Sequence, residues 1–322
     1  MPTDGILSPG LRALCRNMHA DSPEAAIRSA CLRLLERCGI HTPPVPLNPL
    51  LEALDVAFSW SRSGPHWQEG QSSASLQVRE GRLAIFIHEE YAYHRWRRTR
   101  FSIAHELAHA LLYRILDDSE LSESLDKDNE SHRYLERLCN LGAAEILMPT
   151  HMFRISLREN TLSPKGLLDL YDTFLVSENS LLWKVTSLLP ETSVTRWRKH
   201  ARNSDEKVEP RVISCYPPYR HWEVAPWLPS GATTKHINPD LVTSVIDHGE
   251  VCHSERLKVK LGRREWSCSA VATFFKNRKS RDLPLFRGLQ VGDETTDFAT
   301  RDALLFTQNE TERFSLPWKS QS

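Results

Sequence analysis

The feature that most constrains this chain is an H-E-x-x-H motif at residues 105–109. Residues four apart lie on one face of an α-helix, so His105 and His109 can direct two imidazoles at one metal ion. Glu106 lies at the edge of that face, where it can reach a water bound to the metal without being a ligand itself. The motif therefore predicts a metal-binding helix.

The residues around the motif predict that this helix is buried. They contain no Pro or Gly, and most are apolar: Phe101, Ile103, Ala104, Leu107, Ala108, Ala110, Leu111 and Leu112. The structural alternative is a core helix that carries two His and one Glu without any ligand. His and Glu rarely occur in an apolar helix unless they are paired or bind a metal, so we favour the metal site.

A catalytic zinc site needs a third protein ligand and one open position. The chain after His109 does not continue as H-x-x-G-x-x-H, so a third His of the metzincin type is absent. The next strongly helical stretch is 131–149, where Glu136 and Asn140 lie four apart beside the apolar face. Glu136 is the candidate third ligand, with a solvated carboxylate as its structural alternative. Asn140 is a candidate to orient a ligand.

Together these segments resemble the ImmA/IrrE family of metallopeptidases, over about residues 45–189. The family core reads R-x-x-x-A-H-E-x-x-H and then E-x-x-A-N-x-F-A-A-x-x-L-M-P. This chain matches the first part at 100–109 and the second at 136–149, in register throughout. Cys139 replaces the usual Ala and Gly142 the usual Phe. Both are packing changes that leave the ligand positions intact.

The resemblance implies an α+β fold with a zincin-like metallopeptidase domain, in which a small β-sheet accompanies the metal-binding helices. It implies that His105, His109 and Glu136 bind the metal, which would be Zn²⁺ or another divalent ion such as Mn²⁺. Glu106 would be the general base of a metalloendopeptidase. The family's usual substrate is a helix-turn-helix transcriptional repressor, so we expect a regulated, site-specific protease in stress response and transcription regulation.

Several alternatives remain open at this point. The chain could be a non-catalytic regulatory or toxin–antitoxin-type binding protein that keeps the fold and the metal. A pure binder does not need Glu106, so the intact motif favours catalysis. Tyr113, His151 and the Arg cluster before the metal helix are all candidates to stabilise the oxyanion. His88 and His94 are further candidate ligands, although packing or surface roles are favoured for both.

Composition limits the class of protein and its compartment. A length of 322 residues suits two domains, and a formal net charge of zero predicts no polyanion partner. Seven scattered Cys without a C-x-x-C pair favour a reducing compartment. The polar N-terminus and the lack of a long apolar segment favour a cytoplasmic protein without a membrane partner.

We expect four parts along the chain. They are an N-terminal helical segment (1–44), the metallopeptidase domain (45–189), a linker (190–210) and a β-rich C-terminal domain with a sensory or substrate-recruiting role (211–322). The first part contains a helix at 22–38, capped by Ser22 and ended by Gly39. The second contains a short helix at 47–56, strands at 56–60, 75–78 and 83–88, and an acidic loop at 117–129.

The end of the second part resembles a helix-turn-helix, because residues 167–189 split at Val176-Ser177. The second helix carries Lys184 as its only basic residue, so we favour packing over base reading. Further strands are expected at 242–246, 256–261 and 266–275. Basic clusters at 263–264 and 276–281 are interpreted as solvated strand ends, which makes direct nucleic-acid binding the weakest hypothesis.

Overall fold

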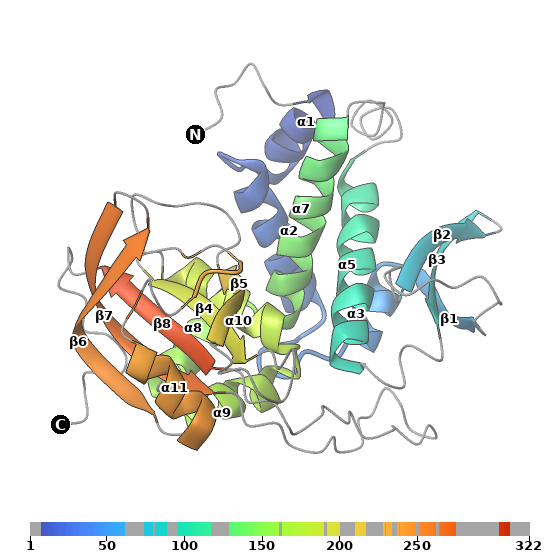
Figure 1. Cartoon of the computed structure of the whole chain (residues 1–322). Helices are drawn as coiled ribbons and strands as arrows, with labels where there is room; N and C mark the ends of the chain where they lie inside the picture. Colours follow the sequence, from blue (N-terminus) through green and yellow to red (C-terminus); the bar gives the residue numbers. More distant parts are fainter. Residues whose placement is uncertain are drawn as a thin grey trace. The chain divides into compact units, whose positions relative to one another are not determined.

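A computed structural model describes most helices and strands of the chain (Figure 1). The described residues are 8–61, 74–79, 81–88, 96–116, 129–160, 163–189, 192–199, 210–216, 228, 230–233, 237, 239–248, 251–261, 264–274 and 303–309. They divide into two units, which are treated separately below. Unit 1 contains the described residues up to 153 together with 174–177, and unit 2 contains the others.

Unit 1 begins with two helices, α1 (Pro9–Met18) and α2 (Pro23–Arg37). Each starts with a Pro that follows a capping Ser, because Pro fits the first helical position where no N–H bond is needed. The predicted cap at Ser22 is confirmed, since its Oγ accepts the Ala25 N–H at 3.2 Å. The helix at 22–38 is thus confirmed, whereas α1 was not expected from the sequence.

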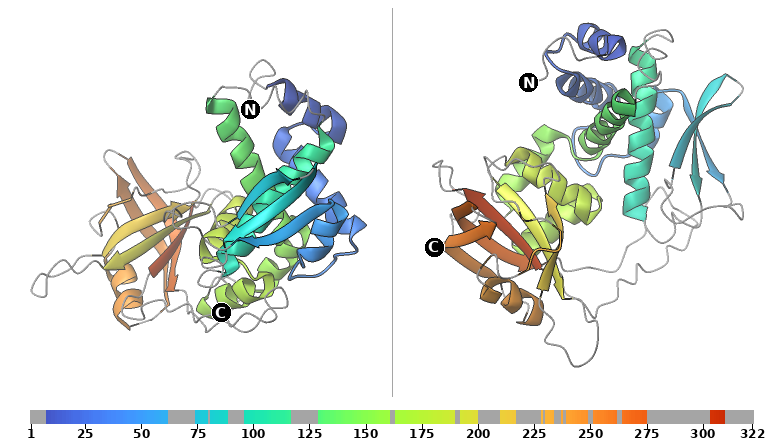
Figure 2. Two further views of the ribbon diagram at one scale, coloured as in Figure 1. Left: turned by 90° about the vertical axis from the view of Figure 1, so that its right-hand side faces the viewer. Right: turned by 45° about the horizontal axis from the view of Figure 1, so that its top comes forward.

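A three-stranded sheet follows the short helix α3 (Asn48–Ala53). Its strands are β1 (Val56–Ser61), β2 (Ala74–Arg79) and β3 (Arg82–His88), in the order β1-β3-β2. β1 is parallel to β3 and β2 is antiparallel to it. All three strands agree with the sequence prediction. β2 is an edge strand of this sheet, which lies beside helix α5 (Trp96–Ile115) (Figure 2).

Helix α5 packs along α7 (Asn129–Leu147), and α2 packs on the same helix α7 (Figure 1). The close approach depends on Gly142 of α7. A Cβ at this position would lie 2.8 Å from the Cβ of Ala108 and 3.2 Å from Cγ1 of Ile27. Real Cβ atoms do not come so close to a neighbouring Cβ, so the three helices can meet here only because residue 142 lacks a side chain.

The N-terminal part of α5 is held by the buried side chain of Arg100, which is 3% exposed. Its Nη2 donates to the carbonyl of Val45 at 2.9 Å, and its Nε donates to the carbonyl of Leu175 at 3.2 Å. Burial lowers the pKa of the Arg100 guanidinium to about 10, with a contribution from Arg97, so it remains charged at neutral pH. A buried charge of this kind must be hydrogen-bonded, and two distant backbone carbonyls meet that need.

Helices α8 (Thr150–Glu159), α9 (Pro164–Phe174) and α10 (Glu178–Leu188) follow α7. The predicted break at Val176-Ser177 is confirmed, because α9 ends at Phe174 and is followed by Leu175, whose φ is 52°. Lys184 of α10 is 2% exposed. A side chain so deeply buried is not available to a DNA phosphate, which supports the packing interpretation of this helix pair.

Unit 2 contains a five-stranded sheet in the order β5-β4-β8-β7-β6. Its strands are β4 (Thr192–Lys199), β5 (Pro210–Tyr216), β6 (Cys252–Leu261), β7 (Arg264–Phe274) and β8 (Ala303–Asn309). β6 and β7 agree with the predicted strands. β4 lies inside the segment 190–210 that the sequence indicated as a linker. The predicted boundaries at 44, 189 and 210 stay predictions.

The strand predicted at 242–246 is wrong, since these residues belong to helix α11 (Pro239–His248). Pro239 at the start and Asp240 in the first turn favour a helix. The buried residues Leu241, Val242 and Val245 fit helical spacing and belong to the core of the larger sheet. The β-branched residues here serve packing and do not indicate a strand.

Some predicted features lie outside the described residues. They are the acidic loop at 117–128, His94 and the basic cluster at 276–281. Among the described helices, no segment combines the length and the apolar character that crossing a bilayer requires.

We predict that Gly142→Ala lowers the free energy of unfolding by about 1–3 kcal/mol, as overpacking of a tight core does. In an unconstrained helix the same change would stabilise by about 0.5–1 kcal/mol. Urea unfolding of the full chain measures the effect. The matched control is the double variant Ala108→Gly with Gly142→Ala, which moves the methyl group to the other helix. Its loss of unfolding free energy should be smaller than the sum of the losses of the two single variants. A stabilising Gly142→Ala would contradict this account of the contact.

Candidate metal centre

Three side chains from α5 and α7 converge on one point in unit 1. Nε2 of His105 lies 3.2 Å from Oε2 of Glu136, and Nε2 of His109 lies 3.3 Å from Oε1 of the same carboxylate. The two Nε2 atoms are 3.1 Å apart. Within the described part of the chain, these residues form the one group whose His, Cys, Asp or Glu atoms are close enough to share a metal ion.

The local sequence explains this convergence. His105 and His109 are one turn apart on α5, so both rings extend from the same face. Glu136 lies on the side of α7 that meets this face, because Gly142 and Ala108 allow the two helices to approach closely. The candidate ligands predicted from the sequence are therefore brought together by the packing of one helix pair.

The imidazoles are oriented by two neighbours on α7. Nδ1 of His105 lies 3.1 Å from Oδ1 of Asn140, and Nδ1 of His109 lies 3.3 Å from Sγ of Cys139. An amide oxygen can only accept, so Nδ1 of His105 donates its proton to Asn140; whenever His105 is neutral, this leaves the lone pair on Nε2 for a metal. This contact places Asn140 where its predicted role, the orientation of a ligand, requires it. The neighbouring contact by Cys139 was not expected from the sequence.

The donor set fits a divalent cation. Ligand atoms of a tetrahedral site with bonds of about 2.0–2.1 Å lie about 3.3 Å apart. The two Nε2 atoms, 3.1 Å apart, are close to that spacing, and Glu136 meets each imidazole with a different oxygen of its carboxylate. One ligand atom from each of the three residues lies within 4.8 Å of the others. Two imidazole nitrogens and a carboxylate are also a donor combination used in catalytic zinc sites.

The charges at the site are strongly coupled. Hydrogen bonds from His105 and His109 hold the pKa of the Glu136 carboxyl well below its usual range, against the effect of burial. Burial lowers the pKa of His105, but the hydrogen bond and the negative charge of Glu136 outweigh it, so the pKa of His105 is raised overall. The carboxylate is thus ionised and attracts positive charge, either as protons or as a metal ion.

Glu106 lies beside this cluster and is 9% exposed. Its Oε2 accepts the backbone N–H of Leu76 in β2 at 3.0 Å. Burial raises the pKa of the Glu106 carboxyl above its usual value, although the nearby His109 and His105 oppose the change. A carboxylate with a raised pKa is a stronger base than a fully solvated one, which suits proton transfer.

The other sequence candidates lie in different places. Tyr113 is on α5 one turn after His109 and is 38% exposed. His151 is exposed in α8, which follows α7. The end of α7 is already about 16 Å from Glu136 along the helix axis. Arg100 is occupied by the carbonyls of Val45 and Leu175. His88 ends β3, and its side chain is outside the described part of the structure.

Known proteins match part of the chain in sequence. A family model described as the IrrE N-terminal-like domain matches residues 69–182. A "Radiation response metalloprotease IrrE" of Deinococcus deserti is 45% identical over 58 residues, which are 17% of this chain and 20% of the relative. The protein of the same name from Deinococcus radiodurans is 34% identical over 96 residues, 29% of this chain and 28% of the relative.

The matched segments thus span less than a third of either relative. A solved structure described as a Mycobacterium tuberculosis transcriptional regulator is similar at a TM-score of 0.45 and 12% identity, covering 94% of this chain and 81% of that chain. The family match includes the H-E-x-x-H helix and Glu136. Residues 69–182 of this chain therefore match an IrrE N-terminal-like domain, which supports the resemblance to the ImmA/IrrE family.

Proposed function

We propose that this chain is a zinc-dependent endopeptidase, with Mn²⁺ as the alternative metal. The observation that carries the proposal is the convergence of His105, His109 and Glu136 on one point with Glu106 beside it. His105, His109 and Glu136 would hold the metal, and Asn140 and Cys139 would orient the two imidazoles. Glu106 is not a member of the converging group, so it stays available for chemistry.

A bound divalent cation would polarise the peptide carbonyl and acidify a water molecule. Glu106 takes a proton from the attacking water and passes it to the nitrogen of the leaving amine. The Leu76 N–H occupies Oε2 of Glu106, so Oε1 is the oxygen that carries the proton. The hydrogen bond also restricts the orientation of the Glu106 carboxylate, which reduces the rearrangement that proton transfer requires.

The outer edge of β2 supplies the place for an extended substrate. The Leu76 N–H points away from β3 and toward Glu106, so the outward backbone groups of β2 are those of Ala74, Leu76 and Val78. An extended peptide can add to such an edge through main-chain hydrogen bonds. The Val78 side chain is 71% exposed on this strand and offers an apolar contact.

Tyr113 is the residue that we assign to oxyanion stabilisation. At about 100° per residue, it lies about 80° round α5 from His105, between His109 at about 40° and Glu106 at about 100°. Helical side chains extend toward the helix N-terminus, so the phenol covers the turn that carries His109. Burial raises the pKa of Tyr113, as do Cys139, Glu106 and Glu136, which keeps the hydroxyl protonated as a donor.

The substrate that we propose is a helix-turn-helix transcriptional repressor or a similar protein, cut at one site. The proposal extends the resemblance to the ImmA/IrrE family and the name of the two relatives, each described as a radiation response metalloprotease. Cleavage of a repressor would connect a stress signal to transcription in the cytoplasm. The alternative is a regulatory binding protein that keeps the metal without cutting, and the position of Glu106 favours catalysis.

We expect Glu106→Gln to keep one metal ion per chain and to abolish proteolysis. The amide preserves the size and can still accept the Leu76 N–H, but it cannot take a proton. Metal analysis and the appearance of new protein N-termini in extract of the host cell, with wild type against variant, measure the two properties. Glu52→Gln, an exposed carboxylate of α3, is the matched control and should behave as wild type. A variant that still cuts would remove Glu106 from the mechanism; a wild type that cuts nothing would favour the binding protein.

Metal affinity should fall as the pH is lowered. His105 has a raised pKa in the metal-free protein, so its proton competes with the metal already near neutral pH. The affinity should be greatest at about pH 8 and should fall by about tenfold per pH unit for each ligand proton that must be displaced. Competition with a chromophoric chelator from pH 8 to 5.5 gives the profile. An affinity that is constant over this range would contradict ligation by His105.

Tyr113→Phe should lower kcat by about 100-fold and leave KM and metal content unchanged, because an oxyanion donor acts in the transition state. The matched control is Tyr134→Phe on α7, whose hydroxyl donates to Oε1 of Glu24 at 2.7 Å. That variant should lose stability while keeping its kcat. Equal kcat values for Tyr113→Phe and wild type would exclude the assigned role.

A further inference from the structure

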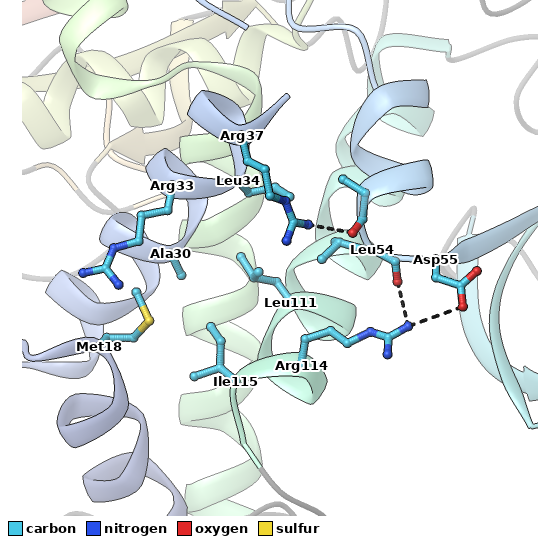
Figure 3. Close-up of a pocket in the computed structure, with 11 residues that line it drawn as sticks. Met18, Ala30, Arg33, Leu34, Arg37, Leu54, Asp55, Leu111, Arg114 and Ile115 are labelled. Atoms are coloured by element: carbon cyan, nitrogen blue, oxygen red, sulfur yellow. Dashed lines mark hydrogen bonds and ion pairs between the residues drawn. The ribbon is translucent and has the colours of Figure 1, made fainter. Parts of the chain in front are cut away.

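A cavity of unit 1 lies between α2, the end of α3 and the C-terminal half of α5 (Figure 3). It has a volume of about 500 Å³, within the usual range for small-molecule sites. Its floor is apolar and consists of Met18, Leu34, Leu54, Leu111 and Ile115. Three guanidinium groups, those of Arg33, Arg37 and Arg114, line the same cavity.

The charge of this cavity is strongly unbalanced. Asp55 is the one carboxylate among the lining residues, against three Arg, which leaves an excess of two positive charges. Its Oδ2 lies 3.8 Å from Nη2 of Arg114, so the pair is loose. The whole chain has a formal net charge of zero, so the excess is a local property of this site.

The guanidinium groups keep unused donors. Nη2 of Arg37 donates to the carbonyl of Ala53 at 2.6 Å, and Nη2 of Arg114 donates to the carbonyl of Leu54 at 2.9 Å. Each guanidinium has five N–H groups, so these bonds to the end of α3 leave most donors available. Arg33 makes no ion pair with any described residue. Figure 3 shows apolar side chains between Arg33 and Arg114.

The cavity lies on the side of α5 that is opposite to the candidate metal centre. On the helix, Leu111, Arg114 and Ile115 lie between about 180° and 280° from His105, whereas the metal-centre residues lie between 0° and about 100°. A molecule in the cavity would therefore not touch Glu106 or the His pair. It would contact α2, α3 and α5 at once, and so would stabilise the arrangement of the helices that frame the metal helix.

We propose that this cavity binds a small organic anion with one carboxylate or phosphate head on a compact apolar body. Arg33 takes the head through charge-assisted hydrogen bonds, and the apolar side chains between Arg33 and Arg114 take the body. Two sources share this chemistry, a nucleoside monophosphate and a medium-chain acyl carboxylate. An inorganic anion has no apolar body and is expected to bind far more weakly.

The test is calorimetric titration of the metal-free full chain with adenosine monophosphate, decanoate and inorganic phosphate. Removing the metal prevents these anions from binding at the other site. We expect one of the two organic anions to bind at a stoichiometry of one, and to bind more weakly at higher salt. Arg33→Gln should weaken it by about tenfold, whereas Arg28→Gln, an exposed cation of α2 outside the cavity, should leave it unchanged.

Tight adenosine monophosphate binding would identify the nucleotide source, and tight decanoate binding the acyl source. The proposal is overturned if neither organic anion binds, if inorganic phosphate binds equally well, or if Arg33→Gln and Arg28→Gln give the same affinity. Arg33 is exposed and makes no ion pair with any described residue, so a misfolded variant is not the expected cause of a loss. The Glu106→Gln variant should bind the anion as wild type does, which separates this result from the test of proteolysis.

Discussion

The packing of α5 against α7 at Ala108 and Gly142 is the contact on which the candidate metal centre depends. The ligand atoms belong to two helices, and their separations of 3.1–3.3 Å leave little tolerance for a shift of either helix. In this chain a side chain at position 142 would meet Ala108 and Ile27, so the present separation of the helices could be kept only if those neighbours changed as well. The residues at positions 27, 108 and 142 are thus matched to one another at the helix contact that positions the candidate ligands.

The same helix pair also orders the groups around the ligands. Asn140 and Cys139 extend from α7 to the far nitrogens of the two imidazoles, and Leu76 of β2 binds Glu106 on the other side. Each polar side chain in this partly buried site therefore has a neighbour that defines its direction. Such preorganisation reduces the rearrangement that a reaction would require.

The parts of the site that depend on local periodicity could be predicted from the sequence. The spacing of His105 and His109 is a property of one helix, and the register of Glu136 followed from the resemblance to a known family. The contacts of Glu106 with Leu76 and of His109 with Cys139 are 30 residues apart in each case. They depend on tertiary packing, for which a single sequence has no signal. The prediction of a strand at 242–246 was wrong for a related reason. Val is stabilised by burial against a sheet in a helix as well as in a strand, and the sequence alone does not distinguish the two.

The anchoring of Arg100 has a consequence for the length of chain that the domain with the candidate metal centre needs. Its two acceptors, Val45 and Leu175, lie 55 and 75 residues away in the sequence, on either side of the metal-binding segment. The family match begins at residue 69, after the first acceptor. A fragment cut at that boundary would leave a buried cation without one of its partners. The smallest autonomous piece of this protein is therefore longer than the stretch by which its relatives are recognised.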